Sequence, residues 1–561
     1  GRAGRRMTGI AVQPPLIVQS DRTLLLEVDN PAYAECRDRL AAFAELTKSP
    51  EHFHTYTVTP LSLWNACAAG TTIDFVVETL QQYARYAPPE KVLNELRGLM
   101  QRYGRVRLQP RDGLLVLETD GSDTLAELQQ NTRLAPMLGD AAGAGSVVVA
   151  PGDRGHLKQE LLKAGFPVED LAGYADGTPY PVHLTTGPDF SLRDYQQRAI
   201  GAFWADGGPR GGSGVLVLPC GAGKTVIGLG ALAQASTHTL ILCTNISAVR
   251  QWTREIIART SVPPEDIGEY SGERKVIRPV TLATYQIMIS RGKGRDHYPH
   301  LDLFTQHNWG LIIYDEVHLL PAPVFRATAE LQSRRRLGLT ATLIREDGKE
   351  GDVFSLIGPK KYDAPWKELE SAGWIAPAEC TEVRVPMTAD ARGDYAAADA
   401  RQRYRIAACN PNKLQALGGL LERHANDHVL VIAQYLDQIA HVGRLARAPV
   451  ITGDTPNVER ERLYAAFRTG ETPVLVVSKV ANFAVDLPEA NVAIELSGTF
   501  GSRQEEAQRL GRVLRPKADG GQAHFYALVS QDTVDQKFAD HRQLFLIEQG
   551  YRYRIEDFIP A

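Results

Sequence analysis

Residues 218–225, with the sequence LPCGAGKT, contain residue types that could hold a phosphate group. Gly221 and Gly223 allow unusual φ angles and a close approach of the backbone to a ligand. Lys224 could reach the β- and γ-phosphates of a nucleotide, and the hydroxyl of Thr225 could hold Mg²⁺. The chemistry expected of this stretch is the binding of a nucleoside triphosphate.

The stretch departs from the strict phosphate-loop pattern, G-x-x-x-x-G-K-[ST], at its first position, where the chain has Leu218. Leu218 belongs to a predicted strand, and Pro219 has no N–H group to offer a phosphate. The donors are therefore expected from Gly221 and Ala222 onward, at the start of a helix, where free N–H groups and the helix dipole favour anions. The alternative is a glycine-rich strand-to-helix turn with an incidental lysine.

A pair of acids follows the apolar run LIIY further along the chain. Asp315 is expected at the carboxyl end of a buried strand, where parallel sheets bind ligands, and there it would hold Mg²⁺ together with Thr225. Glu316 could polarise the attacking water. A strand end followed by solvated acids is the alternative, but it says nothing about Lys224 upstream, so the two motifs together favour a catalytic site.

A third stretch, QRLGRVLR at 508–515, could complete such a site. Gln508, Arg512 and Arg515 are spaced i, i+4, i+7 and therefore share one face of a predicted helix. This face could simply be solvated. We favour the interpretation that its arginines act as fingers on a γ-phosphate held by the other α/β layer, because the two layers need a nucleotide between them to act as one machine. Such fingers contribute roughly 10³–10⁵ in rate.

The elements that would position these residues are short, continuous apolar runs that alternate with helical patterns. Because such runs are typical of strands buried on both faces, they predict parallel sheets covered by helices. The runs lie at 214–218, 239–244, 280–285, 311–315 and 337–342 in one region, and at 428–433, 473–478 and 491–496 in a second. The sequence thus predicts an α/β fold with two α/β layers in tandem, preceded by smaller N-terminal domains of mixed α/β structure.

The composition limits the classes of function. Lys and Arg number 62 and Asp and Glu 66 in 561 residues, so the formal net charge is −4 and nucleic-acid binding would require local basic surfaces. None of the six cysteines lies in a C-x-x-C pair, which argues against an iron–sulfur cluster and suits a reducing interior. No apolar run approaches the ~18 residues of a membrane span, so we expect a cytoplasmic protein. We also expect residues 1–6, which precede Met7, to be a cloning scar outside the fold.

In this order the motifs resemble those of superfamily-two helicases, with TAT at 340–342 between DEVH and QRLGRVLR. The segments 338–376, 478–517 and 545–555 resemble the XPB (xeroderma pigmentosum group B) family of DNA helicases in particular, in a compact prokaryotic form. The resemblance covers most of 186–555. It implies two RecA-like domains with ATP and Mg²⁺ in the cleft between them.

The resemblance also implies a division into domains. These are an N-terminal α/β domain (1–112), a damage-recognition-like α/β domain (113–185), a first RecA-like domain that binds ATP (186–365), and a second RecA-like domain (366–561) with a thumb-like insertion near 387–413 and a C-terminal tail. Residues 113–180 carry ten acids and four bases. Since affinity for DNA depends on neutralising phosphates, this segment should bind DNA poorly by itself, and a protein docking surface is the alternative.

Individual roles also follow from the resemblance. Arg193 and Gln196 match the motif that contacts adenine, and Asp486 matches one that contacts nucleotide and DNA. Thr340 and Thr342 match the motif that couples hydrolysis to DNA movement. A further set is expected near the DNA, namely the RED motif of Arg345, Glu346 and Asp347, close to the point of strand separation, and Arg401, Arg403 and Arg405 at the end of the thumb-like insertion. For the last three, a solvated helix face is an equally good interpretation.

The expected function is that of an ATP-dependent DNA helicase with 3′-to-5′ polarity. It would act on forked or damaged duplex DNA in repair, near the nucleoid and with a nuclease as partner. A double-strand translocase that never separates the strands would use the same catalytic residues and remains an alternative. A scaffold with a vestigial ATPase is disfavoured, because Lys224, Asp315, Glu316 and Arg515 are all present.

Overall fold

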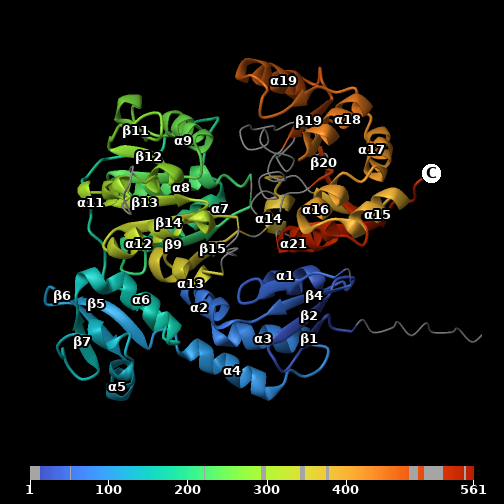
Figure 1. Cartoon of the computed structure of the whole chain (residues 1–561). Coiled ribbons are helices and arrows are strands. Elements are labelled where there is room, and N and C mark those ends of the chain that lie inside the picture. The colour runs from blue at the N-terminus through green and yellow to red at the C-terminus, as the bar shows by residue number, and fades with distance from the viewer. Residues whose placement is uncertain are drawn as a thin grey trace, which may run out of the picture. The chain divides into compact units, whose positions relative to one another are not determined.

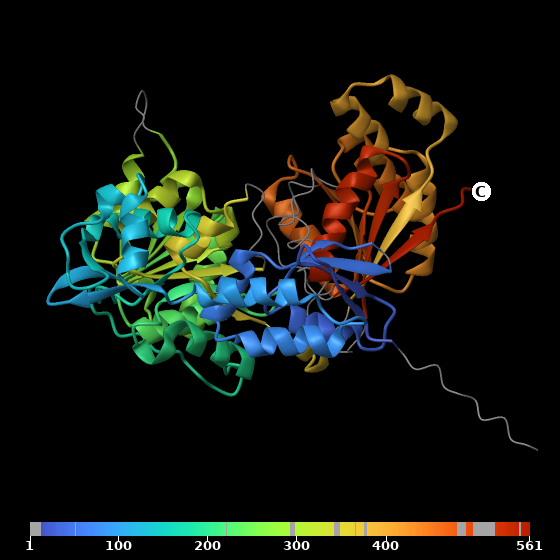
Figure 2. The same ribbon diagram turned by 90° about the horizontal axis from the view of Figure 1, so that it is seen from below.

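The computed structural model describes residues 13–50, 52–219, 221–291, 298–341, 348–364, 366–374, 378–478, 490–497, 522–548 and 551–561. The chain divides into two compact units, residues 1–103 and 104–561. Figure 1 colours the chain from blue at the N-terminus to red at the C-terminus, and Figure 2 shows the same ribbon from below. Each unit is built on sheets of its own.

Within its described residues, the first unit contains an antiparallel sheet of four strands in the order β1-β2-β4-β3. The strands are β1 (Leu16–Val18), β2 (Thr23–Glu27), β3 (Glu45–Lys48) and β4 (Phe53–Thr57), and the helices are α1 (Tyr33–Leu40), α2 (Pro60–Ala68), α3 (Ile73–Tyr83) and α4 (Glu90–Gln101). Helix α2 begins at a capping box, in which the side chains of Thr59 and Ser62 each accept the backbone N–H of the other residue. This unit has the mixed α/β structure that the sequence predicts.

The second unit begins with a small mixed sheet in the order β7-β6-β5-β8. Its elements are β5 (Val106–Arg111), β6 (Leu114–Thr119), α5 (Ser122–Gln130), β7 (Ser146–Val149), α6 (Arg154–Lys163) and β8 (Val168–Asp170). The buried carboxylate of Asp170 accepts hydrogen bonds from Arg154 and Lys158 of α6. Gln159 on the same helix donates to Asp352 at 2.8 Å, and Asp352 is the last residue of α13 (Glu350–Asp352). Helix α6 thus fastens the small sheet to the part of the chain that follows.

The first large sheet has seven parallel strands in the order β11-β12-β10-β13-β14-β9-β15. Its strands are β9 (Ser213–Val217), β10 (Thr239–Cys243), β11 (Ile267–Tyr270), β12 (Val280–Thr284), β13 (Leu311–Asp315), β14 (Arg335–Thr340) and β15 (Lys360–Asp363). The main covering helices are α7 (Asp194–Trp204), α8 (Lys224–Ala235), α9 (Ile246–Arg259) and α12 (Ala322–Glu330). Because the strands are parallel, their carboxyl ends share one edge of the sheet.

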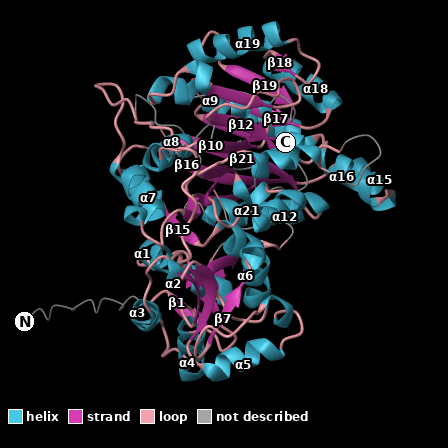
Figure 3. Ribbon diagram, turned by 90° about the vertical axis from the view of Figure 1, so that its left-hand side faces the viewer, coloured by secondary structure: helices cyan, strands magenta, loops and turns pink. Residues whose placement is uncertain are grey.

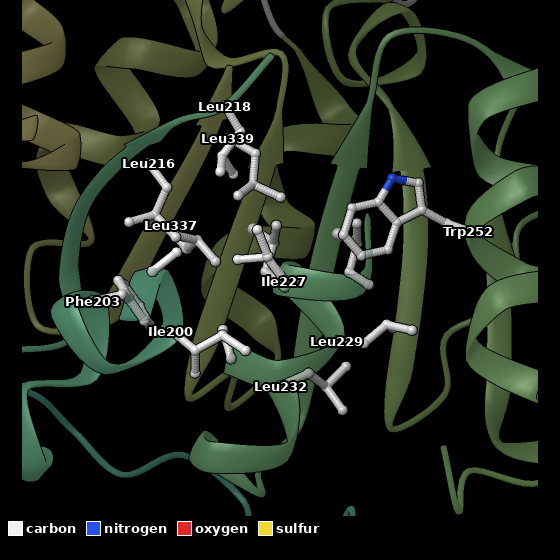
Figure 4. Close-up of a cluster of buried hydrophobic side chains, with 14 of the residues drawn as sticks. Ile200, Phe203, Leu216, Leu218, Ile227, Leu229, Leu232, Trp252, Leu337 and Leu339 are labelled. Atoms are coloured by element: carbon white, nitrogen blue, oxygen red, sulfur yellow. The ribbon is translucent and has the colours of Figure 1, made fainter. Parts of the chain in front are cut away.

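The core of this sheet shows why the strands read as unbroken apolar runs. In Figure 4, Ile200 and Phe203 of α7 and Leu232 of α8 lie with Leu216 of β9 and Leu337 of β14 in one buried cluster. A second cluster covers the opposite face and includes side chains from β10, β13 and α12. Every residue of β10 and β12 is buried, so both faces of these strands are covered.

The second large sheet repeats this architecture with seven parallel strands in the order β18-β19-β17-β20-β21-β16-β22. Its strands are β16 (Ala378–Val385), β17 (Val429–Ala433), β18 (Val450–Ile451), β19 (Val474–Ser478), β20 (Val492–Glu495), β21 (Ala523–Ser530) and β22 (Arg552–Asp557). The helices include α15 (Ala389–Ala397), α16 (Ala400–Ala408), α17 (Asn412–Arg423), α18 (Leu436–Ala446), α19 (Asn457–Thr469) and α21 (Val534–Glu548). Figure 3 shows cyan helices around the magenta strands.

The predicted fold class, two tandem α/β layers with parallel sheets after smaller mixed domains, is confirmed. In the second large sheet a buried ion pair joins two helices, since the Lys413 ammonium on α17 donates to Asp535 on α21 at 2.6 Å. The same ammonium donates to the carbonyl of Leu496 at 2.7 Å. Among the described residues, no helix is both long and apolar enough to cross a membrane.

Candidate functional site

The predicted phosphate loop connects β9 to α8. Leu218 is fully buried and its N–H donates to the carbonyl of Thr340 at 2.9 Å, so this residue continues the strand. Gly221 and Gly223 have φ angles of 85° and 80°, in the region that favours glycine. A Cβ atom on Gly223 would lie 2.6 Å from the side-chain nitrogen of Gln196. Leu218, which stands where the strict motif has its first glycine, therefore lies in the strand and outside the loop.

The lysine of this loop meets the two predicted acids at the carboxyl edge of the first large sheet. Asp315 is the last residue of β13, and Glu316 follows it with a φ of 51°. The Lys224 ammonium forms an ion pair with the Glu316 carboxylate. The Asp315 carboxylate accepts a hydrogen bond from the Trp252 indole at 3.0 Å, and its carbonyl accepts one from the Tyr285 hydroxyl at 2.9 Å. Lys224, Trp252 and Tyr285, which lie far apart in the sequence, thus contact the two acids at one edge of the sheet.

Burial and mutual charge set opposite shifts on the two acids. Burial, and after it the neighbouring Glu316 carboxylate, together raise the pKa of Asp315 to about 6, although Lys224 opposes both. Burial would also raise the pKa of Glu316, but Lys224 and His318 outweigh it, and that pKa is lowered. A cation placed beside Asp315 would therefore relieve the cost of its buried charge.

The donor set suits a magnesium nucleotide. The Thr225 hydroxyl and the Asp315 carboxylate are oxygen ligands of the kind Mg²⁺ prefers, and Lys224 supplies a charge for phosphate. Among the described residues there is no group of three or more His, Cys, Asp or Glu side chains that could hold a metal alone.

The residues predicted to contact adenine adjoin the phosphate loop. The Gln196 side chain accepts the backbone N–H of Arg193 at 3.0 Å and donates to the carbonyl of Ala222 at 3.3 Å. The Tyr195 hydroxyl donates to the same carbonyl. A pocket of about 670 Å³ joins Arg193 and Gln196 to the two acids. It is lined among others by Phe190, Arg193, Gln196, Gly221, Gly223, Lys224, Thr225, Arg259, Asp315, Glu316 and Trp374.

A histidine connects the acids to the predicted coupling motif. His318 lies 3.6 Å from Glu316 through its Nδ1 atom and 2.7 Å from the Thr340 hydroxyl through the same nitrogen. His318 therefore connects the carboxyl end of β13 with the end of β14. Eight predicted residues lie outside the described part of the chain, namely Thr342, Arg345, Glu346, Asp347, Asp486, Gln508, Arg512 and Arg515; their roles stay predictions.

The three basic residues of the thumb-like insertion lie on helix α16 but differ in their contacts. Arg403 donates to the carbonyls of Tyr395 and Ala396 at 3.2 Å each, near the C-terminus of α15. Arg405 pairs with Asp437 at 3.1 Å, and both side chains are exposed. Arg401 is exposed and makes no hydrogen bond or ion pair with any described residue. Arg403 thus joins two helices, Arg405 forms a surface ion pair, and Arg401 is exposed to solvent.

Several side chains at or near the site had no assigned role in the sequence. Trp252 lies in no motif, and Trp374 lies in the XPB-like segment 338–376 without a role of its own; no spacing relates either residue to the acids or the loop. His318 was visible as the last residue of DEVH, but nothing in the sequence linked it to Thr340. These contacts arise from strand order and helix packing, which local patterns do not encode.

Comparisons with known proteins match this chain to helicases over nearly its whole length. Residues 369–559 match the ERCC3/RAD25/XPB C-terminal helicase family, residues 189–345 match the family "type III restriction enzyme, res subunit", and residues 16–142 match a helicase conserved C-terminal domain. The chain is 58% identical over 545 residues to the DNA 3′-5′ helicase XPB of Mycobacterium tuberculosis, covering 97% of this chain and 98% of the relative. It is 56% identical to the protein of the same name from Kineococcus radiotolerans, covering 97% and 96%. It is 31% identical to the general transcription and DNA repair factor IIH helicase/translocase subunit XPB/SSL2 of Saccharomyces cerevisiae, covering 97% and 72%.

Proposed function

This chain belongs to the XPB family of DNA helicases, and from that premise we propose that it is an ATP-dependent DNA helicase with 3′-to-5′ polarity. One observation supports this most directly. Lys224, Asp315 and Glu316 meet at the carboxyl edge of a parallel sheet, beside a glycine loop that opens a helix. Parallel α/β sheets bind ligands at this edge, and these three groups are those that phosphoryl transfer to water requires.

Each group has a proposed role. The backbone N–H groups from Gly221 to Thr225 hold the phosphates at the N-terminus of α8. Lys224 contacts the β- and γ-phosphates, while Thr225 and Asp315 would hold Mg²⁺, which when bound neutralises charge on the phosphates. Glu316 orients the attacking water and accepts its proton.

The Lys224 ammonium forms an ion pair with the Glu316 carboxylate. A γ-phosphate bound by the loop would compete with this carboxylate for the ammonium, and Glu316 would then be available to the attacking water. The contact of His318 with both Glu316 and Thr340 offers a route by which this change reaches the end of β14.

The finer assignments belong to the same proposal. We propose ATP with Mg²⁺ as the substrate complex, forked or damaged duplex DNA as the polymer, and repair at the nucleoid, with a nuclease as partner. The XPB resemblance supports these, and the relative from Saccharomyces cerevisiae is named for DNA repair. The arginine finger of Arg512 and Arg515 and the DNA contacts of Arg345, Glu346 and Asp347 are proposed on the same ground.

Strand displacement on forked duplexes that carry a single tail tests the function. We expect forks with a 3′ tail to open only with ATP, and forks with a 5′ tail to stay closed. Opening of 5′-tailed forks alone would contradict the polarity. A motor that removes a protein roadblock from closed duplex but opens neither fork would instead be the double-strand translocase, which shares every catalytic residue named above.

The contacts of α16 predict different outcomes for neighbouring arginines. Arg401→Ala should weaken DNA binding and reduce the slope of log affinity against log salt by about 1, because an available cation that contacts phosphate releases one counterion. Arg403→Ala should instead lower the free energy of unfolding by about 1–2 kcal/mol, since it leaves carbonyls near the end of α15 without their donor.

Salt-dependent DNA binding and thermal unfolding of both variants check this prediction. Arg462→Ala on α19 is the matched control, because Arg462 is exposed and pairs only with its helix neighbour Glu459. Equal DNA affinity for Arg401→Ala and the wild type would assign Arg401 to a solvated helix face.

A further inference from the structure

An aromatic side chain with no role so far lines the nucleotide pocket. Trp374 lies in the segment between α14 (Trp366–Ser371) and β16, which connects the two large sheets in sequence. It shares the pocket with the phosphate loop and the catalytic acids. Its indole ring lies against the Arg193 guanidinium, whose central carbon is 4.1 Å from the ring centroid. It remains 37% exposed.

The backbone around Trp374 fixes its position. The N–H of Trp374 donates to the carbonyl of Leu369 at 2.9 Å, and Gly373 between them has a φ of 74°. This is the Schellman arrangement that ends a helix with a glycine in the left-handed region. Leu369 is completely buried in the core of the first large sheet, and Glu368 pairs with Arg198 of α7 at 2.8 Å. The ring is therefore held at the pocket by a structured helix end.

The other aromatic ring of the pocket differs from Trp374. The Phe190 ring also carries a guanidinium, that of Arg259, whose central carbon lies 4.4 Å from the ring centroid, but Phe190 is half-buried whereas Trp374 is exposed. The amide of Gln196 is engaged with Arg193 and Ala222, inside the protein. A planar base that enters the pocket therefore finds its largest accessible apolar surface on the indole. Flat aromatic groups stack favourably on such a ring, and a cation behind the ring does not block its other face.

We infer that Trp374 stacks on the adenine base of bound ATP, with Arg193 supporting the indole from behind. The inference rests on the proposed ATPase function and adds a base-positioning residue to it. Because Trp374 belongs to the connection between β15 and β16, base binding would act directly on the segment that joins the two large sheets.

The test compares ATP with ribose 5-triphosphate, which has the same phosphates and sugar but no base. The KM for ATP and the inhibition constant for ribose 5-triphosphate are measured in DNA-stimulated hydrolysis by the full chain. Trp374→Ala should raise the KM for ATP about 5- to 150-fold, the factor that corresponds to about 1–3 kcal/mol of base stacking. It should leave the inhibition constant for the base-free compound and kcat within about threefold.

Two further variants make the result decisive. Trp374→Phe keeps a stacking ring and should stay within about threefold of the wild type, whereas Trp374→Leu keeps apolar bulk without a ring and should behave like alanine, even if the alanine variant folds poorly. An unchanged KM for ATP in the leucine variant would overturn the inference. Equal weakening of both compounds would also overturn it, because Trp374 would then only position the phosphate loop. A wild type that hydrolyses no ATP would instead refute the proposed function.

Discussion

Lys224→Ala is expected to reduce DNA-stimulated ATP hydrolysis by at least about 10²–10³-fold, the range seen when a single stabiliser of transition-state charge is removed. The Lys224 ammonium forms an ion pair with the Glu316 carboxylate at the carboxyl edge of the first large sheet. Its loss removes the charge that faces the transferring phosphoryl group. It also removes the lysine partner of the Glu316 carboxylate, which keeps His318 at 3.6 Å and a hydrogen bond from the backbone of Ala341.

Steady-state hydrolysis and equilibrium ATP binding check this prediction. Lys163→Ala is the matched control, because Lys163 is exposed and pairs with Glu160 at 2.8 Å far from the loop in sequence; it should turn over ATP normally. Glu316→Gln separates binding from chemistry, since it removes the group that activates water and leaves the phosphate loop intact. It should bind ATP and hydrolyse it poorly. Turnover near the wild-type rate in Lys224→Ala would remove the nucleotide assignment.

Arg515→Ala should depress the rate of hydrolysis by roughly 10³–10⁵-fold, if this residue is the arginine finger that its spacing and the family resemblance predict. A cation aimed at charge that develops in the transition state stabilises that state more than the ground state, so ATP affinity should change far less than kcat. Arg512→Ala should act in the same direction, with some loss of ATP binding. Lysine at either position should rescue poorly, because it lacks the planar fork of donors.

Arg462→Ala again provides the comparison, as an arginine of the same domain that is paired on the surface of α19. Near-wild-type hydrolysis by both Arg512→Ala and Arg515→Ala would mean that their helix face is only solvated. That result would leave the phosphate loop at Lys224 in place and refute the mechanism that draws on both large sheets.

Local sequence was sufficient for most interior strands of the two large sheets, though not for β16 or β21, and for the carboxyl edge at which Lys224 meets Asp315 and Glu316. The runs at 239–244 and 311–315 correspond to β10 and β13, because a strand covered on both faces must be apolar throughout. The order of glycine, lysine and acid further predicted which residues would gather, since parallel strands present their carboxyl ends together. Family resemblance then named the function, as the matches with relatives over nearly the full chain show.

The peripheral strands could not be predicted in this way. Strands β11, β15, β18 and β22 are the edge strands of the two large sheets. An edge strand has fewer neighbours and can stay polar, as KKYD in β15 and RYRIED in β22 do. Strand β16 is interior but carries the buried Glu382, which accepts a hydrogen bond from Tyr553 at 2.6 Å. Because the sequence of β16 contains several polar residues, it does not predict a buried strand.

The tertiary structure alone decided which distant side chains meet. Sequence spacing placed Lys224 and Glu316 in one site, but not in an ion pair, and it could not bring His318 to Thr340. It treated Arg401 and Arg403 alike, whereas the packing of α15 against α16 engages only the second. It left Trp374 without a role, although a helix end anchored in the core places the indole on Arg193. The physical reason is that periodicity reports how each element is buried, while contacts between elements depend on strand order and helix packing.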